Sequence, residues 1–473
     1  MPTSPRDRAL LRDLARRVAE IAARPEEAHK ARLWTACNDL RPERAMVYVD
    51  PQNGWREIDA AWLRLECEDP SLHGWEQALR RQILRHERIP DDFPILATLE
   101  VGLHVTGSGY DDYGLQLGVT RSSQPDGAYH IVPAVESERD LDKLHFRPIR
   151  IDLVATERAV ERAADLLGDL LPVRRTGRTS WRYGLTRVLV HMWGLDRMMY
   201  DMYDNPGLLH RLMGFLRDDF LREIDLYEQA GAVSLNNTPD HVTGSGGLSP
   251  THDLPGDGWD GVPRVRHCLC WGESQETVGV GPGQFEEFVL QYQLPLLERF
   301  GLVDYGCCEP LDHKLDLLLE RIPHLRWVSV APWANRELAA AKLGRRCVFV
   351  YKPNPAPICT PQPNWDRAER EIRETLEISR GCAVHVVMKD THTFCGQPER
   401  VTRWAEMASR VVGEAAGDAR GGGVPGVPPR QPARGGHGHG GRQVQGGLGR
   451  RDDRTPNGQR SCPCPPRLRQ AGK

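Results

Sequence analysis

Side chains that bind metals or transfer protons follow several short apolar runs in the second half of the chain. They are thiols, carboxylates, imidazoles, amides and an ammonium, whereas purely structural loops would show more Ser, Thr and Gly. Because the carboxyl ends of parallel strands meet at one edge, we expect these groups to lie close together. The candidates are Asn237, His241, Gly246, Glu273, Gln275, Cys307, Cys308, Glu309, Lys352, Asp390, His392 and Cys395.

The thiol pair Cys307-Cys308, followed by Glu309, indicates a metal site. Zinc takes four ligands from thiolates, imidazoles and carboxylates, and a catalytic zinc keeps one position open. Either thiol could supply a thiolate, and Glu309 a carboxylate. This mixture of donors suits zinc or cobalt better than magnesium. The last predicted strand end offers two further metal ligands, His392 and Cys395.

Other strand ends carry groups suited to catalysis. Glu273 and Gln275 could orient a substrate oxygen or move a proton. Lys352 could bind a carboxylate or phosphate, and Asp390 and His392 could set each other's protonation. We therefore predict catalytic roles for Glu273, Lys352, Asp390 and His392, and cofactor binding for Asn237, His241, Gly246 and Gln275.

Structural alternatives remain open for several candidates. The thiols Cys307 and Cys308 could pack beneath their loop while Glu309 pairs with Lys314. The polar groups at 273, 275 and 352 could be ordinary solvated loop residues. For the nearby run 267–270, alternation along a strand places two cysteines on one face and a histidine on the other, so a structural role is favoured.

The elements that would position these groups alternate between strand and helix. This alternation predicts a parallel sheet with right-handed crossovers, most simply a (β/α)₈ barrel. An open doubly wound sheet is the alternative, but no glycine-rich phosphate loop supports it. Strands near 95–105 and 149–154 could complete eight. The other predicted strands are 232–235, 264–271, 302–305, 327–330, 347–351 and 383–388, and the predicted helices are 1–30, 203–231, 282–300, 314–321, 335–343, 365–379 and 398–412.

Composition narrows the class of protein. Hydrophobic residues make up 40% of the 473 residues, which is enough for a substantial core, and the net charge of −3 gives no argument for a nucleic-acid or anionic-membrane partner. The chain shows neither an apolar run long enough for a membrane span nor a signal peptide. We therefore expect a cytoplasmic protein whose cysteines are reduced.

Three regions follow from these patterns. Residues 1–90 are predicted as a helical and irregular extension, and residues 91–413 as the barrel. Residues 414–473 are rich in Gly, Pro, Arg and Gln, and they contain almost no aliphatic side chains. Such a segment cannot bury enough surface to fold, so we expect a disordered tail.

Five segments carry a family resemblance: residues 235–247, 271–276, 300–312, 352–355 and 389–393. Together they resemble the uroporphyrinogen decarboxylase-like superfamily, on the side of its corrinoid-linked methyltransferases. The resemblance implies a (β/α)₈ barrel with its pocket at the carboxyl ends of the strands. In the methyltransferase members a zinc held by a His-x-Cys pair and a later Cys activates a thiol. Here Tyr305 takes the His position and Cys307 the first Cys position, so Glu309 and His392 would have to substitute.

Three functions fit these expectations. The first is a methyl-group transferase or demethylase that uses zinc, a small-molecule methyl donor and a corrinoid carried by a partner protein. The second is a metal-free decarboxylase for a carboxylated substrate such as a tetrapyrrole, with Lys352 and nearby arginines holding carboxylates and Asp390 or His392 handling the proton. The third is a corrinoid- or tetrapyrrole-binding partner that is not an enzyme.

Overall fold

The computed structural model describes residues 3–109, 113–115, 118–123, 129–135 and 137–421. The chain divides into two units, Met1–Gly423 and Val424–Lys473, and the second lies outside the described residues. Of the predicted tail, only 414–421 is described, as the last turns of a helix that continues past the predicted end at 412. Among the described residues, no helix combines the length and apolar character needed to cross a bilayer.

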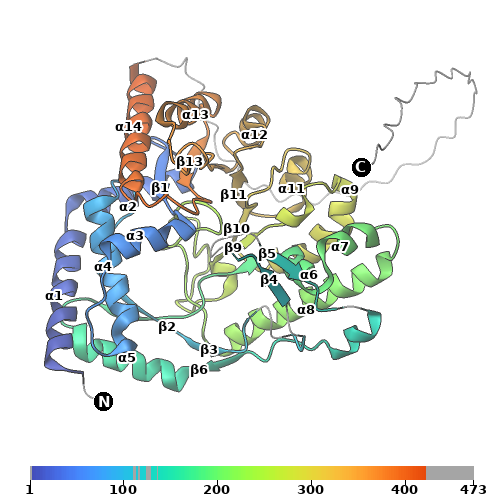
Figure 1. The fold of residues 1–473 in the computed structure, drawn as a ribbon, viewed down its shortest axis with the longest axis horizontal. Coiled ribbons are helices and arrows are strands. Elements are labelled where there is room, and N and C mark those ends of the chain that lie inside the picture. The colour runs from blue at the N-terminus through green and yellow to red at the C-terminus, as the bar shows by residue number, and fades with distance from the viewer. Residues whose placement is uncertain (1–2, 110–112, 116–117, 124–128, 136, 422–473) are drawn as a thin grey trace, which may run out of the picture. The chain divides into compact units, whose positions relative to one another are not determined.

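Seven parallel strands form the main sheet, in the order β1-β13-β12-β11-β10-β9-β8 (Figure 1). From β8 to β13, neighbours in the sheet are neighbours in sequence, as strand–helix alternation predicts. The parallel α/β architecture is confirmed, and closure into an eight-stranded barrel stays a prediction. The strands are β1 (Met46–Val49), β8 (Arg182–Tyr183), β9 (Leu269–Gly272), β10 (Leu302–Tyr305), β11 (Leu325–Val330), β12 (Val348–Tyr351) and β13 (Ala383–Met388).

The strands expected to complete the eight lie in small sheets instead. β3 and β6 show only one half-buried residue between two exposed ones, which does not suit a strand covered on both faces. The predicted strand at 232–235 supplies only a bridge between Val233 and Arg178. β2 (Leu99–Gly102) pairs with β7 (Val173–Thr176), β3 (His104–Thr106) with β6 (Arg150–Asp152), and β4 (Gly118–Arg121) with β5 (Tyr129–Val132).

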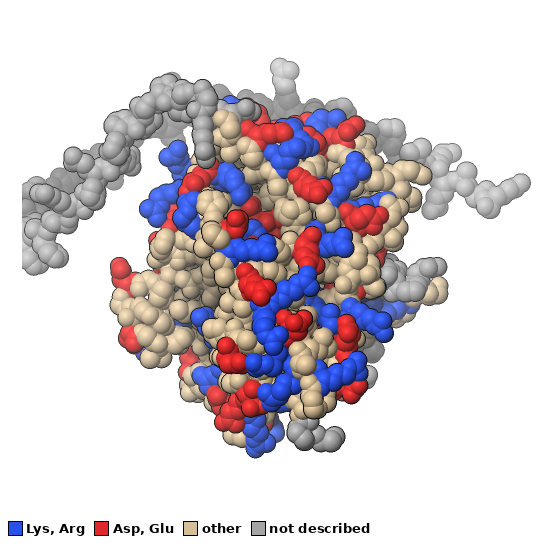
Figure 2. All heavy atoms as spheres, turned by 90° about the vertical axis from the view of Figure 1, so that its left-hand side faces the viewer, with Lys and Arg blue, Asp and Glu red and all other residues tan. Residues whose placement is uncertain are grey.

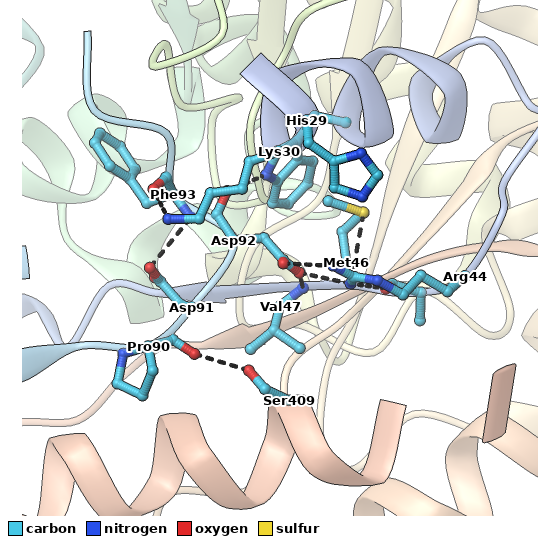
Figure 3. Close-up of polar contacts among 12 residues, drawn as sticks. His29, Lys30, Arg44, Met46, Val47, Pro90, Asp91, Asp92, Phe93 and Ser409 are labelled. Carbon is cyan, nitrogen blue, oxygen red and sulfur yellow. Dashed lines mark hydrogen bonds and ion pairs between the residues drawn. The ribbon is translucent and has the colours of Figure 1, made fainter. Parts of the chain in front are cut away.

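β1 belongs to the main sheet, although the sequence analysis places residues 1–90 outside the barrel. Its free edge is sealed by side chains rather than by another strand (Figure 3). The amides of Val47 and Val49 donate to the carboxylates of Asp92 (2.8 Å) and Asp91 (2.9 Å). Arg44 in turn binds both Asp92 oxygens, at 2.6 and 2.8 Å. Because an unpaired strand edge invites further pairing, these contacts explain how the described ladder can end at β1.

Helices α11 to α14 lie along one side of the sheet (Figure 1). The predicted helix 1–30 is interrupted, because Pro25 forces Arg24 into an extended conformation before a second helix begins. The helices are α1 (Pro5–Ala22), α2 (Pro25–Asn38), α3 (Trp55–Trp62), α4 (His73–Arg88), α5 (Leu153–Leu167), α6 (Leu185–Trp193), α7 (Leu195–Asp201), α8 (Pro206–Gln229), α9 (Pro282–Phe285), α10 (Gln291–Leu297), α11 (Leu315–Arg321), α12 (Arg336–Leu343), α13 (Trp365–Ile378) and α14 (Arg400–Gly421).

Side chains along each strand alternate between two apolar clusters. In β12, Val348 and Val350 join a cluster with Trp34 of α2, whereas Phe349 and Tyr351 join the cluster packed under the outer helices. Both faces of the sheet are therefore covered, and we call the face toward α2 the inner face. Burying an aliphatic side chain of this size contributes roughly 1.5–3 kcal/mol. The outer surface that carries α1 shows mixed acidic and basic side chains (Figure 2).

Candidate functional site

Cys307 and Cys308 lie in the turn that follows β10, at the carboxyl edge of the sheet. Their sulfur atoms are 3.5 Å apart, and both residues are half-buried. The turn requires glycine at Gly306, where φ is +103°. A Cβ at that position would also lie 2.9 Å from atoms of Leu311 and Ser329. The strand end therefore presents the thiol pair to the inner face of the sheet, where Ser245 and Asp390 approach it.

Lys352 comes from the end of β12 and is buried beside this pair. Its ammonium donates to the Ser245 hydroxyl at 2.8 Å and to the Cys307 carbonyl. The same hydroxyl lies 3.6 Å from the Cys307 sulfur. The ammonium is therefore held at this turn by two hydrogen bonds. Its positive charge lies beside the Cys307 thiol.

The two thiols have different pKa values. A hydrogen bond from Cys308 and the Lys352 charge lower the pKa of Cys307 to about 7, against burial and the Glu309 carboxylate. The same hydrogen bond and burial raise the pKa of Cys308. Near neutral pH, Cys307 is therefore partly a thiolate while Cys308 remains a thiol. A thiolate is the nucleophilic form of cysteine.

Glu309 stabilises the turn after β10 by hydrogen bonds to backbone amides. Its two carboxylate oxygens accept hydrogen bonds from the amides of Ser274 (3.2 Å) and Cys307 (2.9 Å), and the side chain is buried. Burial raises its pKa. Both oxygens are engaged by backbone donors, so Glu309 positions Cys307 rather than facing an open site.

Glu273 lies at the end of β9 and is also buried. Burial and the neighbouring carboxylates of Glu276 and Glu309 raise its pKa to about 9. One oxygen accepts the amide of Gln275 at 3.2 Å. Glu273 is therefore protonated at neutral pH, which suits a proton donor better than a base.

Asp390 joins the thiols from the end of β13. The Cys308 sulfur lies 3.3 Å from each of its carboxylate oxygens. Its backbone has a φ of +54°, a strained conformation for a residue with a side chain. The preceding Lys389 forms a buried ion pair with Asp50 of the turn after β1. Residues from β1, β10, β12 and β13 thus meet at one edge of the sheet.

His392 and Cys395 do not join this cluster. The His392 ring contacts the Asn53 amide at 3.0 Å, and the Cys395 thiol donates to the Cys359 carbonyl at 3.3 Å. The predicted proton pair of Asp390 and His392 is likewise separated, because each contacts a different partner. After Asp390 the chain packs against the turn after β1, where the Gly54 amide donates to the Thr391 carbonyl at 2.9 Å.

As placed, the predicted ligands do not make a four-ligand zinc site. Cys307, Cys308 and Asp390 approach one another, but Glu309 is held by backbone amides, and the other two predicted ligands lie elsewhere. Within the described ranges, no group of three or more His, Cys, Asp or Glu side chains is arranged to hold a metal ion.

Tyr305, at the position where the resemblance places a histidine ligand, points away from the thiols. It belongs to the cluster under the outer helices, and its hydroxyl donates to the Gln293 side chain at 2.8 Å. Along β10, Leu302 faces inward and Val303 outward, so the alternation also turns Tyr305 outward.

Three of the residues predicted to bind a cofactor lie in the loop between residues 236 and 250. Asn237 donates to backbone carbonyls of the 251–254 turn. A Cβ at Gly246 would lie 2.4 Å from the Thr243 hydroxyl, so this close approach requires glycine. Burial lowers the pKa of His241 to about 4, and its ring is therefore neutral.

Several residues of the site have no predicted role in the sequence analysis. Trp271 and Trp333 each donate an indole hydrogen bond of 2.8 Å, to the carbonyls of Gly306 and Cys308 respectively. They therefore fix the backbone on both sides of Cys307. Burial raises the pKa of Asp304, inside β10, to about 7. The sequence signal for Asp304 is an acid within an otherwise apolar strand.

We expect Cys308→Ala to shift the reactivity of Cys307 toward higher pH. The substitution removes the hydrogen bond that does most to lower the Cys307 pKa, so the thiolate forms about one pH unit or more higher. Iodoacetamide labelling of the Cys307 peptide, followed by mass spectrometry across neutral pH, measures the midpoint. Cys359→Ala is the matched control and leaves the midpoint near 7. An unchanged midpoint in Cys308→Ala would contradict the shared-proton arrangement.

Comparison with known proteins gives little guidance. No known family profile matches the chain, and no curated protein matches it. Among solved structures, the fold is similar to that of a methyltransferase from Methanosarcina mazei, with 12% sequence identity and a TM-score of 0.46. The match covers 80% of this chain and 98% of the other. A likeness this distant indicates neither substrate nor mechanism.

Proposed function

We propose that the protein is a methyl-group transferase or demethylase in which the Cys307 thiolate is the nucleophile. The observation that carries this proposal is the lowered pKa of a half-buried thiol, held between a protonated thiol and a buried ammonium. Activated nucleophiles of this kind are typical of covalent catalysis. The remaining groups at the edge position this sulfur.

The reaction that this geometry supports has two balanced steps. In the first, the Cys307 sulfur donates an electron pair to the methyl carbon of a donor; the S–C bond forms as the bond from carbon to the donor heteroatom breaks. The heteroatom leaves with its electron pair and takes up a proton from water. In the second, an acceptor nucleophile takes the methyl group from Cys307 and regenerates the thiolate.

Decarboxylation is less well supported by the same contacts. Lys352, the residue predicted to hold the substrate carboxylate, already contacts Ser245 and Cys307. Decarboxylation would also need the proton pair of Asp390 and His392, whose side chains contact different partners. Methyl transfer needs neither of these groups, and its nucleophile is present as the Cys307 thiolate, so we prefer it.

The finer assignments of the sequence analysis remain separate proposals. They are an eight-stranded barrel of the uroporphyrinogen decarboxylase-like type, a corrinoid protein as methyl acceptor, and zinc. Zinc would need donors beyond Cys307 and Cys308, because Glu309 is engaged by backbone amides. Elemental analysis of the purified protein tests zinc directly, and reconstitution with a corrinoid protein tests the acceptor.

The test of the proposed function follows a CD₃ group from candidate donors to the protein. Methoxyaryl, methylamine and methyl thioether compounds sample the common heteroatoms. Label on the Cys307 peptide supports transfer. Release of CO₂ from a carboxylated substrate, without any labelled peptide, would instead establish the decarboxylase.

A further inference from the structure

A cavity of about 500 Å³ lies apart from the thiols, between the end of β7 and β8. This volume falls in the range typical of small-molecule sites. Its lining combines apolar side chains, three hydroxyl residues and two arginines, and no carboxylate belongs to it. The polar groups are Thr176, Arg178, Thr179, Ser180 and Arg182, and the apolar and aromatic groups include Leu103, Val105 and Tyr227.

The two arginines differ in how their charges are balanced. Arg178 forms an ion pair of 2.8 Å with the buried Glu223 and packs over the Tyr227 ring. Arg182 is exposed, and among the described residues no acidic side chain lies within ion-pair distance of it. Its Nε donates to the Ser180 hydroxyl at 3.0 Å. Of the two arginines that line the cavity, Arg182 is therefore the one without an acidic partner among the described residues; the Glu100 carboxylate beside the lining contacts the Thr176 hydroxyl.

The Arg182 guanidinium is also held in place. It stacks over the Trp271 ring, with 5.5 Å between the guanidinium carbon and the ring centroid. Because the ring and Ser180 constrain the Nε side, the two terminal nitrogens remain available as a planar pair of donors. Such a pair matches the two oxygens of a carboxylate.

We propose that this cavity binds a small organic carboxylate, with Arg182 holding the carboxylate and Leu103, Val105 and Tyr227 contacting the apolar body. The Thr179 and Ser180 hydroxyls supply further hydrogen bonds. This proposal does not depend on methyl transfer, because it rests on the lining of the cavity and on the unbalanced charge. Trp271 contacts both the cavity and the thiol site. Its ring lies under Arg182, and its indole donates to the Gly306 carbonyl beside Cys307.

The test is a calorimetric titration of the full chain with benzoate, and with benzamide as its neutral match. We expect benzoate to bind and benzamide not to bind. Arg182→Gln removes the charge and the paired donors but leaves a polar side chain, so it should weaken benzoate binding about tenfold or more. Arg380→Gln is the matched control, because Arg380 is an exposed arginine paired with Glu377 on the surface. It should leave binding unchanged.

Each outcome decides the proposal. Absence of benzoate binding to the folded wild-type chain would overturn it, as would equal binding by Arg182→Gln or equal binding of benzamide. Tighter binding of inorganic phosphate than of benzoate would replace the carboxylate with a phosphate ligand and so overturn the class. If Arg182→Gln fails to fold, Arg182→Lys takes its place, with a several-fold loss expected because lysine lacks the paired donors.

Discussion

Cys307→Ser is expected to reduce methyl transfer by roughly a thousandfold or more, since loss of a nucleophile removes the covalent route. Serine keeps the size of the side chain, and it can still contact the Ser245 hydroxyl. Its hydroxyl is not ionised at neutral pH, whereas the thiol has a pKa of about 7. Steady-state turnover with the best CD₃ donor, measured on wild type and variant at equal concentration, gives the result.

Cys382→Ser is the control for this loss. Cys382 is a largely buried thiol before β13 whose sulfur donates to the Ala340 carbonyl, and serine can keep that bond. The control should retain nearly full turnover. A Cys307→Ser variant that is folded and turns over at the wild-type rate would contradict the nucleophilic role of Cys307.

Arg147→Ala is expected to destabilise the protein by about 3–5 kcal/mol, because it leaves the buried Asp219 without its main partner and removes one of the two arginines paired with Glu223. Arg147 is 1% exposed. It binds Asp219 at 2.5 Å and Glu223 at 3.1 Å, both on α8, and its guanidinium packs 4.5 Å from the centre of the Phe220 ring. Urea denaturation followed by far-UV circular dichroism measures the free energy of unfolding.

A surface arginine provides the comparison. Arg373 of α13 pairs with Glu369 and Glu414, but all three are exposed enough for water to screen the interaction. Arg373→Ala should therefore change the unfolding free energy only slightly. If both variants lost a similar free energy of unfolding, burial of the Arg147 ion pairs would not explain their contribution to stability.

The second half of the fold could be predicted because its short apolar runs alternate regularly with segments of helical periodicity. The helix over 203–231 is α8, which begins with Pro206 and buries an apolar stripe. β1 could not be identified, because four apolar residues do not distinguish a strand from a short helical segment. Its place in the sheet is fixed by the distant Asp91 and Asp92, which the local pattern of β1 does not reveal.

Only the site residues next to a strand end could be placed from the sequence. Cys307 and Asp390 lie within two residues of their strands, and they converge as parallel packing requires. His392 and Cys395 lie further into a loop whose direction depends on a positive φ at Asp390 and another at Cys395. Apolar periodicity does not encode such turns. The outward direction of Tyr305, in contrast, follows from strand alternation and was open to prediction.

The most direct measurement is peptide mass spectrometry after a single turnover with a CD₃ donor and no acceptor. If Cys307 is the nucleophile, one CD₃ group is found on the Cys307 sulfur, and it is lost when an acceptor is supplied. A donor that is consumed while Cys307 stays unlabelled, with the label elsewhere or only in solution, would contradict the proposal that the Cys307 thiolate carries the methyl group.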